Sequence, residues 1–512
     1  MFQFGLNKNK TTPIFDDGYC YLQIGVSDNN TTLYLECHEK SRRRCPARGV
    51  KKIESPFVSL TRNHNHIRNY DIELIYNFKH ELYSSVISTT RDLRILFNEI
   101  SIRHLRASTL VPYISIVKTM QGWRKSSCPR VPKTIQEYVQ LLNSQRWRSR
   151  FFSNDSNLDV GNIIGTDGSV ATVFIDGIML QNFTNVNLYV DATYKVCPRQ
   201  PNKKIYQFFT IMASFDDTVL PVAWSFMSHK SMSCYHSVMN RFQQLTPHLQ
   251  VLSITTDFEV GLRNVLRGLY PNAVLKGCYF HHVQALMKKA EKIKLLDVLN
   301  DWDDGQDFFR KLITLALLPS HQIIPAYKWL LTSYSAFHAA FHQFLLYYES
   351  YWLKVIKPEN FSVFGCRDKT NNYVEANNRR LNMEFGVHPS IWNFTEKLMA
   401  LYQKSKIELE SLMMGLPVRR QTRIKYLIEE AVLWRAWDLY NANVLDFKHF
   451  LECTNKMIRI FENDRGLFSV NEVDGFINAE IKMYIAVDQN LYIAIDEGDN
   501  NRPEYIIFIT EN

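Results

Sequence analysis

Hydrophobic and polar positions along residues 170–260 follow the period of β-strands. The runs ATVFIDGIML, NLYVDATYKV, YQFFTIMASF and VLPVAWSFMS are strand-like, and Asp216 and Asp217 form the turn between the last two. From SCYHSVMNRFQQL onward, helical patterns alternate with the strand-like runs VLSITTDF and NAVLKGCYF. A group of strands followed by alternating helices and strands predicts an α/β sheet.

The regions on either side have different periods. Residues 19–70 contain short strand-like runs broken by the turn SDNNTT, which predicts a small β-rich module. Apolar residues recur at helical steps over 71–110, and Thr134 with Glu137 predicts the start of a capped helix. Helical patterns fill 291–360 and run from 371 to about 460. The last segment, 471–512, is strand-like and acidic.

Charge is distributed unevenly along the 512 residues. The first 150 residues carry a net charge of +12 and the remaining 362 carry −3. The run KSRRRCPARGVKK contains seven basic residues and no acid: Lys40, Arg42, Arg43, Arg44, Arg48, Lys51 and Lys52. Such a basic front indicates binding to a polyanion such as nucleic acid. A solvated basic face or a nuclear localisation segment would have the same composition.

The sequence shows no targeting segment of the secretory type. The start, MFQFGLNKNK, lacks an apolar signal core, and no run of 18 or more apolar residues occurs. We therefore expect neither secretion nor a membrane-spanning helix. The nine cysteines are scattered and odd in number, which favours a reducing compartment over a disulfide framework.

Two apolar strands carry an acid where they end. Asp191 interrupts NLYVDATYKV, and Asp257 ends VLSITTDF. If the two strands are neighbours, their carboxylates lie close together and require a counter-charge, which Mg²⁺ or Mn²⁺ would supply. Glu375, in the first turns of a predicted helix, is a candidate third ligand, although neither periodicity nor propensity selects it. Acids at strand ends are more often turn or cap residues, and Glu259 is a possible substitute ligand.

A Cys-x-x-His pair follows the second of these acids. Cys278 and His281 lie in GCYFHH at a strand-to-helix junction. Because no second pair lies nearby, a complete zinc site is not expected from the pair alone. Cys278 is then a small buried residue and His281 supports the next helix, a role that His282 could also fill.

The β-rich module contains its own set of metal-binding side chains. Cys37, Cys45, His64 and His66 offer two sulfurs and two nitrogens, separated by 7, 18 and 1 residues. This donor set suits tetrahedral Zn²⁺. A module of about 50 residues with few large apolar side chains gains its stability from such a metal. The alternative is a chance grouping of buried thiols and surface histidines. His38 and Cys20 are nearby residues of the same types that could be mistaken for ligands.

Four stretches resemble the transposase domain of Mutator-like elements: LYVDATYKV, TDFEVGLRNVL, LKGCYFHHVQALMKK and TNNYVEANNRRLN, in this order. The resemblance covers roughly 170–400. It implies a ribonuclease H-like fold, two Mg²⁺ or Mn²⁺ ions at a DDE triad of Asp191, Asp257 and Glu375, and a helical insertion at about 290–365. It also implies that Cys278 and His281 support the catalytic site or contact DNA, without making either a metal ligand.

The N-terminal pattern resembles the FLYWCH zinc finger, which ends in His-x-His and is associated with DNA binding. YLEC stands where that family has an aromatic residue before the first cysteine. The resemblances together predict an α/β, ribonuclease H-like catalytic core with an all-helical insertion, preceded by a small β-rich zinc finger and a helical region. The expected domains are the finger at 1–70, a basic helical region at 71–160, the catalytic domain at 161–400, a helical region at 401–470 and the acidic tail at 471–512.

The implied function is cut-and-paste DNA transposition in the nucleus. The front end would bind terminal inverted repeats of double-stranded DNA, and a dimer or larger oligomer would cleave and join strands by two-metal chemistry. No membrane and no small-molecule substrate is expected. Two alternatives stay open: a domesticated, non-catalytic DNA-binding protein, and a ribonuclease H-like nuclease of host origin.

Overall fold

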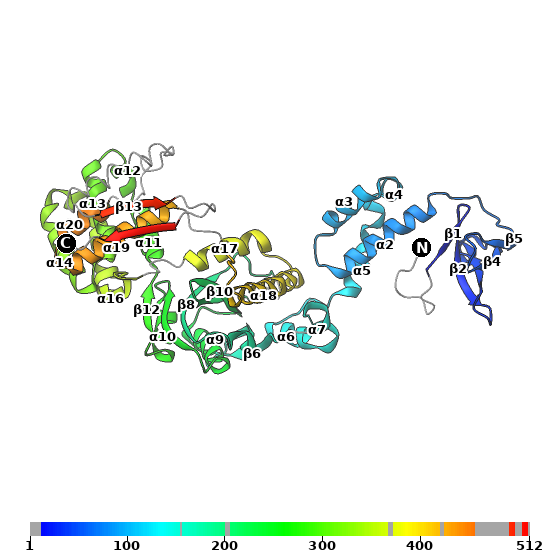
Figure 1. Ribbon diagram of the computed structural model, residues 1–512, viewed down its shortest axis with the longest axis horizontal. Helices are drawn as coiled ribbons and strands as arrows, with labels where there is room; N and C mark the ends of the chain where they lie inside the picture. The colour runs from blue at the N-terminus through cyan, green and yellow to red at the C-terminus, as the bar shows by residue number, and fades with distance from the viewer. Residues whose placement is uncertain are drawn as a thin grey trace. The chain divides into compact units, whose positions relative to one another are not determined.

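The computed structural model describes residues 12–153, 156–199, 205–366, 372–419, 424–455, 491–496 and 504–509 (Figure 1). The chain divides into two compact units. The first contains 1–281 and 368–421, and the second contains 282–367 and 422–512. Within the described residues, no helix is long and apolar enough to cross a membrane.

The first unit begins with a five-stranded antiparallel sheet in the order β1-β2-β3-β4-β5. Its elements are β1 Ile14–Asp16, β2 Tyr19–Val26, β3 Thr32–Cys37, the short helix α1 Lys40–Arg43, β4 Arg48–Lys52 and β5 Ser59–Arg62. The predicted β-rich module is therefore confirmed. Its buried hydrophobic residues are few: Cys20, Tyr21, Leu35, Cys37, Cys45 and Ala47. Burial of so little apolar surface supplies little stability.

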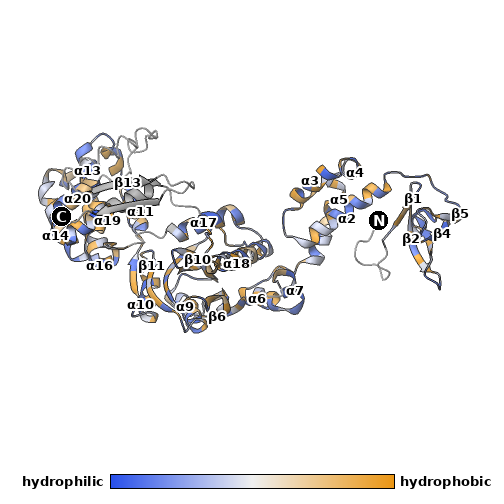
Figure 2. Cartoon of the chain, in the orientation of Figure 1, coloured by the Kyte–Doolittle hydropathy of each residue, from blue (hydrophilic) through white to orange (hydrophobic). Residues whose placement is uncertain are grey.

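A helical region with its own core follows this sheet. It contains α2 Ile72–Ser88, α3 Leu93–Arg103, α4 Leu105–Leu110 and α5 Tyr113–Ser127. Phe78 and Leu82 of α2 pack against Phe97 of α3 and Met120 of α5. Apolar residues at helical spacing thus form the core that the sequence pattern predicted. Hydrophilic and hydrophobic residues both occur along these helices (Figure 2), and some apolar side chains, such as Ile102 and Ile114, are exposed.

Two helices lead into the main sheet: α6 Ile135–Asn143 and α7 Gln145–Phe151. The Thr134 hydroxyl accepts the Glu137 N–H at 3.0 Å, which confirms the predicted helix start. The helical stretch is split into α6 and α7 at Ser144, where the backbone is extended.

The main sheet has seven strands in the order β12-β11-β8-β9-β10-β7-β6. The strands are β6 Asp159–Ile164, β7 Val170–Ile175, β8 Asn185–Thr193, β9 Gln207–Phe215, β10 Thr218–Met227, β11 Gln250–Thr256 and β12 Val274–Gly277. β11 runs parallel to both β8 and β12, whereas β8, β9, β10, β7 and β6 pair antiparallel. The mixed α/β class predicted from the alternating pattern is confirmed.

Three boundaries differ from the sequence pattern. The strand predicted in ATVFIDGIML ends at Ile175, because the buried Asp176 carboxylate accepts the N–H groups of Ile178 and Met179 and starts the short helix α8 Gly177–Leu180. The last predicted strand ends at Gly277, so Cys278 precedes a helix. The pattern also missed β6, whose strand of alternating buried and accessible residues lies at the sheet edge.

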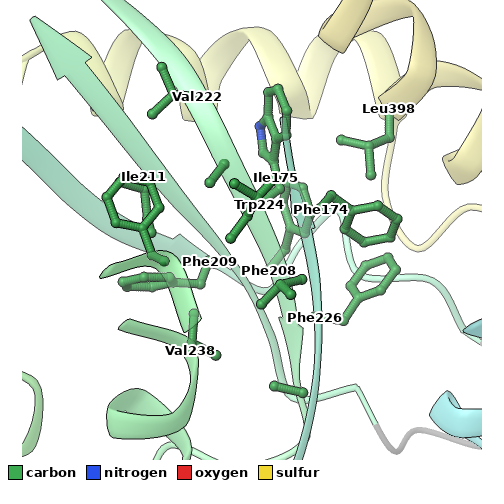
Figure 3. Packing of buried hydrophobic residues seen from close by; sticks show 14 of the residues in the cluster. Phe174, Ile175, Phe208, Phe209, Ile211, Val222, Trp224, Phe226, Val238 and Leu398 are labelled. Atoms are coloured by element: carbon green, nitrogen blue, oxygen red, sulfur yellow. The ribbon is translucent and has the colours of Figure 1, made fainter. Parts of the chain in front are cut away.

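Helices cover both faces of this sheet: α9 Met232–Leu245, α10 Val260–Leu269, α17 Asn372–Phe385 and α18 Ile391–Met413. Neighbouring residues of a strand point to opposite faces. Phe208 accordingly packs on Phe394 of α18, whereas Phe209 packs on Tyr235 of α9. Figure 3 shows Leu398 of α18 on one side of the strands and Val238 of α9 on the other.

The described part of the second unit is mainly helical. Its elements are most of α11 Tyr279–Lys292, α12 Leu295–Leu299, α13 Asp303–Thr314, the 3₁₀ turns η1 Leu315–Leu317 and η2 Ser335–Phe337, α14 Ser320–Ser333, α15 His338–Tyr347, the π-helix η3 Tyr348–Ile356, α16 Pro358–Phe361, α19 Ile424–Asn441, α20 Phe447–Asn455, and an antiparallel hairpin of β13 Leu491–Asp496 and β14 Glu504–Ile509. The buried Lys311 ammonium donates to Asp307, Tyr334 and Glu452. Helices from the expected insertion and the expected C-terminal region thus share one core. Residues 456–490 of the expected C-terminal region and tail lie outside the described residues.

Candidate functional sites

Asp191 lies near the end of β8, opposite Thr210 of β9. One carboxylate oxygen accepts the Ala192 N–H at 2.7 Å, and the other accepts the Asn378 side-chain amide at 2.9 Å. Burial raises the pKa of Asp191 to about 7, and the charge of Asp257 adds to this rise. The side chain is therefore held in place, and the charge of Lys230 only partly offsets the effect of burial on its ionised form.

Asp257 directly follows β11, the parallel neighbour of β8. In the register of these strands, Thr255 pairs with Tyr189, so two further residues along each strand bring Asp257 beside Asp191. This is the neighbouring arrangement that the sequence pattern required. The two carboxylates lie at the carboxyl ends of adjacent parallel strands, where α/β sheets bind their ligands.

Glu375 comes from the first turn of α17, which packs on β8. Val374 joins a buried cluster with Tyr189 and Met212, and the Tyr373 and Tyr189 rings lie 5.3 Å apart. Burial raises the pKa of Glu375; the charge of His281 opposes that rise and the charge of Asp191 adds to it. The structure thus brings Glu375 near enough to Asp191 for their charges to interact, although no sequence pattern selected it.

Cys278 and His281 lie beside the same glutamate. The Cys278 N–H donates to the Thr256 carbonyl at 3.0 Å, which anchors it to the strand that ends at Asp257. Its thiol donates to Glu375 Oε1 at 3.8 Å. His281 is one helical turn further on. By contrast, the alternative residue His282 is buried in the second unit, where its ring stacks on Phe361 at 5.0 Å.

A cavity of about 360 Å³ opens at the aspartates. Sequence analysis missed two polar residues that line it, Lys230 and Tyr235. Glu259, the suggested substitute ligand, is hydrogen-bonded by Tyr235 at 3.1 Å and ion-paired with Lys230 at 2.7 Å. Burial by itself would lower the pKa of Lys230. The ion pair with Glu259 raises it by more, so the pKa of Lys230 lies above its ordinary value. Nothing in the sequence around Lys230 distinguishes it from other lysines.

The four predicted ligands of the N-terminal sheet converge. The nitrogen or sulfur atoms of Cys37, Cys45, His64 and His66 all lie within 4.8 Å of one another. Cys37 Sγ is 3.2 Å from His66 Nε2, and Cys45 Sγ is 3.5 Å from His64 Nδ1. The module therefore contains a Cys₂His₂ site compatible with zinc.

Neighbouring groups orient both imidazoles of this site. His66 Nδ1 donates to the Ile67 carbonyl at 3.1 Å, which leaves the lone pair of Nε2 directed at Cys37. His64 Nε2 is hydrogen-bonded to the Tyr21 hydroxyl at 2.9 Å, and its ring stacks on Tyr19. Burial lowers the pKa of His64 to about 4, so the ring is neutral, as metal binding requires.

The seven basic residues of the predicted DNA-binding run lie in α1, in β4 and between them. All are exposed except Lys51, which is half-buried. Part of their charge is neutralised locally, because Lys40 pairs with Glu36 and Arg43 pairs with Glu39. DNA would compete with these acids at α1.

Comparison with known proteins bears on the domain that contains Asp191 and Asp257. Residues 187–285 match the MULE transposase domain family. The matched segment contains most of β8, all of β11, Asp191, Asp257, Cys278 and His281, and it ends before Glu375. The match supports a transposase-related function and DNA binding for this segment. No curated protein matches the chain.

Proposed function

We propose that this chain is a Mutator-like DNA transposase that cuts and joins DNA with two Mg²⁺ or Mn²⁺ ions at Asp191, Asp257 and Glu375. The observation that carries the proposal is the placement of Asp191 and Asp257 at the ends of adjacent parallel strands, with Glu375 of α17 near enough to Asp191 for their charges to interact. Two of the three lie in the segment that matches the MULE transposase domain.

The strand order supports a ribonuclease H-like core. β8, β9 and β10 form an antiparallel meander, and β11 and β12 extend the sheet on the other side of β8 in parallel. The first acid lies on the central strand of this five-strand group, and the second directly follows its parallel neighbour. The helices from α12 to α16 lie within about 290–365 and correspond to the proposed insertion.

The donor set fits divalent metal ions. The pKa of Asp191 and that of Glu375 are both raised by burial and by neighbouring acids, so a nearby cation would favour their ionised forms. Carboxylate oxygens are the ligands that Mg²⁺ and Mn²⁺ prefer. The adjoining cavity leaves room for a phosphate and water.

The residues would divide the work as follows. Bound metal ions supply activation of a water or DNA 3′-hydroxyl and stabilisation of the leaving oxygen. Asp191, Asp257 and Glu375 hold the reacting groups in line, which is the main contribution of a protein to phosphoryl transfer. Asn378 fixes the orientation of the Asp191 carboxylate, and Lys230 adds positive charge to the cavity wall.

We assign the N-terminal module as a FLYWCH-type finger holding one Zn²⁺. The basic residues of α1 and β4 would bind the phosphates of terminal inverted repeats, with the helical region beside them. Cleavage at two element ends calls for a dimer or larger oligomer acting in the nucleus. These assignments rest on the Cys₂His₂ geometry, the positive front end and the implied reaction.

An excision assay tests the catalytic assignment. The full chain is incubated with a supercoiled plasmid carrying the genomic flanks of its own gene, in Mg²⁺, in Mn²⁺ or in EDTA. We expect excision only with a divalent metal, and its loss in Asp257→Asn and Glu375→Gln without loss of plasmid binding. Binding without cleavage by the wild-type chain would instead identify a domesticated, non-catalytic protein. Nicking without strand joining would favour a nuclease.

A further inference from the structure

We propose that Cys278, His281 and Glu375 form a second transition-metal site, selective for Zn²⁺, that shares Glu375 with the catalytic carboxylates. Zinc binding itself does not depend on the proposed function. The site was not visible in the sequence, because the Cys-x-x-His pair and its third ligand are 97 residues apart. The fold brings them together by placing α17 beside the junction of β12 and α11.

The positions of the three ligand atoms support this assignment. All three lie within 4.8 Å of one another, and Cys278 Sγ is 3.8 Å from Glu375 Oε1. In a tetrahedral zinc site, the metal–ligand lengths imply ligand-to-ligand distances of about 3.4 to 3.6 Å. Movements on the order of 1 Å, within the reach of side-chain rotation, therefore close the site around an ion.

The environment of His281 is a second, independent observation. Its Nδ1 atom is buried and has no hydrogen-bond partner within the described part of the chain. A buried ring nitrogen without a partner is costly, and a metal ion or a water satisfies it. Cys278 is fully buried, and its backbone N–H bond to Thr256 fixes the sulfur beside Glu375.

The donor set separates this site from the catalytic one. A thiolate and an imidazole select zinc over magnesium, whereas Asp191 and Asp257 offer only hard oxygens. Three protein ligands leave a fourth position open to water. Because Glu375 belongs to both sites, zinc held by Cys278 and His281 would withdraw that carboxylate from Mg²⁺. This consequence, inhibition by zinc, rests on the proposed function.

Zinc counting tests the site in the full chain. We expect about two zinc ions per chain by elemental analysis after dialysis, one of them in the finger. Cys278→Ser should reduce the count to about one, and Cys45→Ala should do the same by removing the finger ion. Cys197→Ser, which alters a buried thiol elsewhere in the same unit, should leave the count unchanged. A count that Cys278→Ser does not change would overturn the proposal.

Substitution of Co²⁺ for zinc distinguishes loss of the second metal site from loss of folding. His281→Ala keeps the buried thiol, so it should lose the second Co²⁺ ion while the thiolate-to-cobalt absorption of the finger persists. Retention of the second ion by His281→Ala would also contradict the site. The measurement is independent of DNA cleavage: a chain that binds the second zinc but excises no DNA in Mg²⁺ even after that zinc is removed would refute the transposase assignment and leave the metal site standing.

Discussion

Asp191 has a raised pKa because burial and the charge of Asp257 both disfavour its ionised form. The folded-state pKa, about 7, exceeds the ordinary value of 3.8. The folded chain therefore binds this proton more tightly than the unfolded chain does. The resulting stabilisation is fully present below about pH 4 and is lost as the pH rises to about 7. Above that range, the ionised carboxylate destabilises the fold unless a cation is bound.

The first prediction concerns Asp191. Asp191→Asn removes the charge and keeps the shape, so in EDTA at pH 8 the variant should unfold at a higher temperature than the wild-type chain. The difference should shrink as the pH falls toward about 4, and Mg²⁺ should stabilise the wild type alone. Scanning calorimetry measures both effects. Asp216→Asn, the same change in an exposed hairpin turn with φ near 50°, is the control. A variant less stable than wild type at pH 8 would contradict this interpretation.

Individual residues also show what sequence alone can and cannot predict. Asp191 and Asp257 stood out as candidates in the sequence, because Asp191 interrupts an apolar strand pattern and Asp257 ends one. Glu375 required the family resemblance, since an acid in the first turn of a helix is ordinary. Asn378, Lys230 and the contact between Cys278 and Glu375 could not be predicted, because each depends on elements that meet only in the folded chain.

Helix α17 is the element on which the proposed catalytic site depends. It presents Glu375 and, one turn later, Asn378, whose amide holds Asp191 at 2.9 Å. Loss of a partner that orients a metal ligand commonly lowers activity by 10- to 100-fold. We expect Asn378→Ala to reduce plasmid excision at least about 10-fold while DNA binding is kept. Met383→Ala, on the exposed side of the same helix, should retain activity. Equal activity of the two variants would mean that Asn378 does not position Asp191.

Most elements could be predicted from periodicity, because strands and helices in this chain bury one face or one stripe. The errors occurred where a single polar contact decides the boundary, as at Asp176, which starts α8. Which strands pair with one another could not be predicted from the hydrophobic periodicity, because strand pairing depends on long-range contacts. The same holds for the common core of the insertion helices and α20, which is linked through Lys311 and Glu452.

At the scale of the whole molecule, positive charge is concentrated in the first 150 residues. Each phosphate contact made by a basic side chain releases counterions, so the logarithm of the binding constant falls with the logarithm of salt concentration. We expect Arg44→Gln/Arg48→Gln to weaken binding to duplex DNA and to reduce this slope by up to about 2. Lys328→Gln/Lys354→Gln, which removes the same charge from exposed positions in the second unit, should leave the slope unchanged. Fluorescence anisotropy between about 50 and 200 mM salt measures both. An unchanged slope in the arginine variant would place DNA binding elsewhere.

The central claim is that Asp191, Asp257 and Glu375 bind divalent metal together. Anomalous diffraction from crystals of the full chain soaked in MnCl₂ tests it most directly. The account predicts manganese peaks at coordination distance from oxygens of all three carboxylates, and their loss in Asp191→Asn crystals. Manganese bound only elsewhere, or bound at the two aspartates with Glu375 turned away, would contradict it.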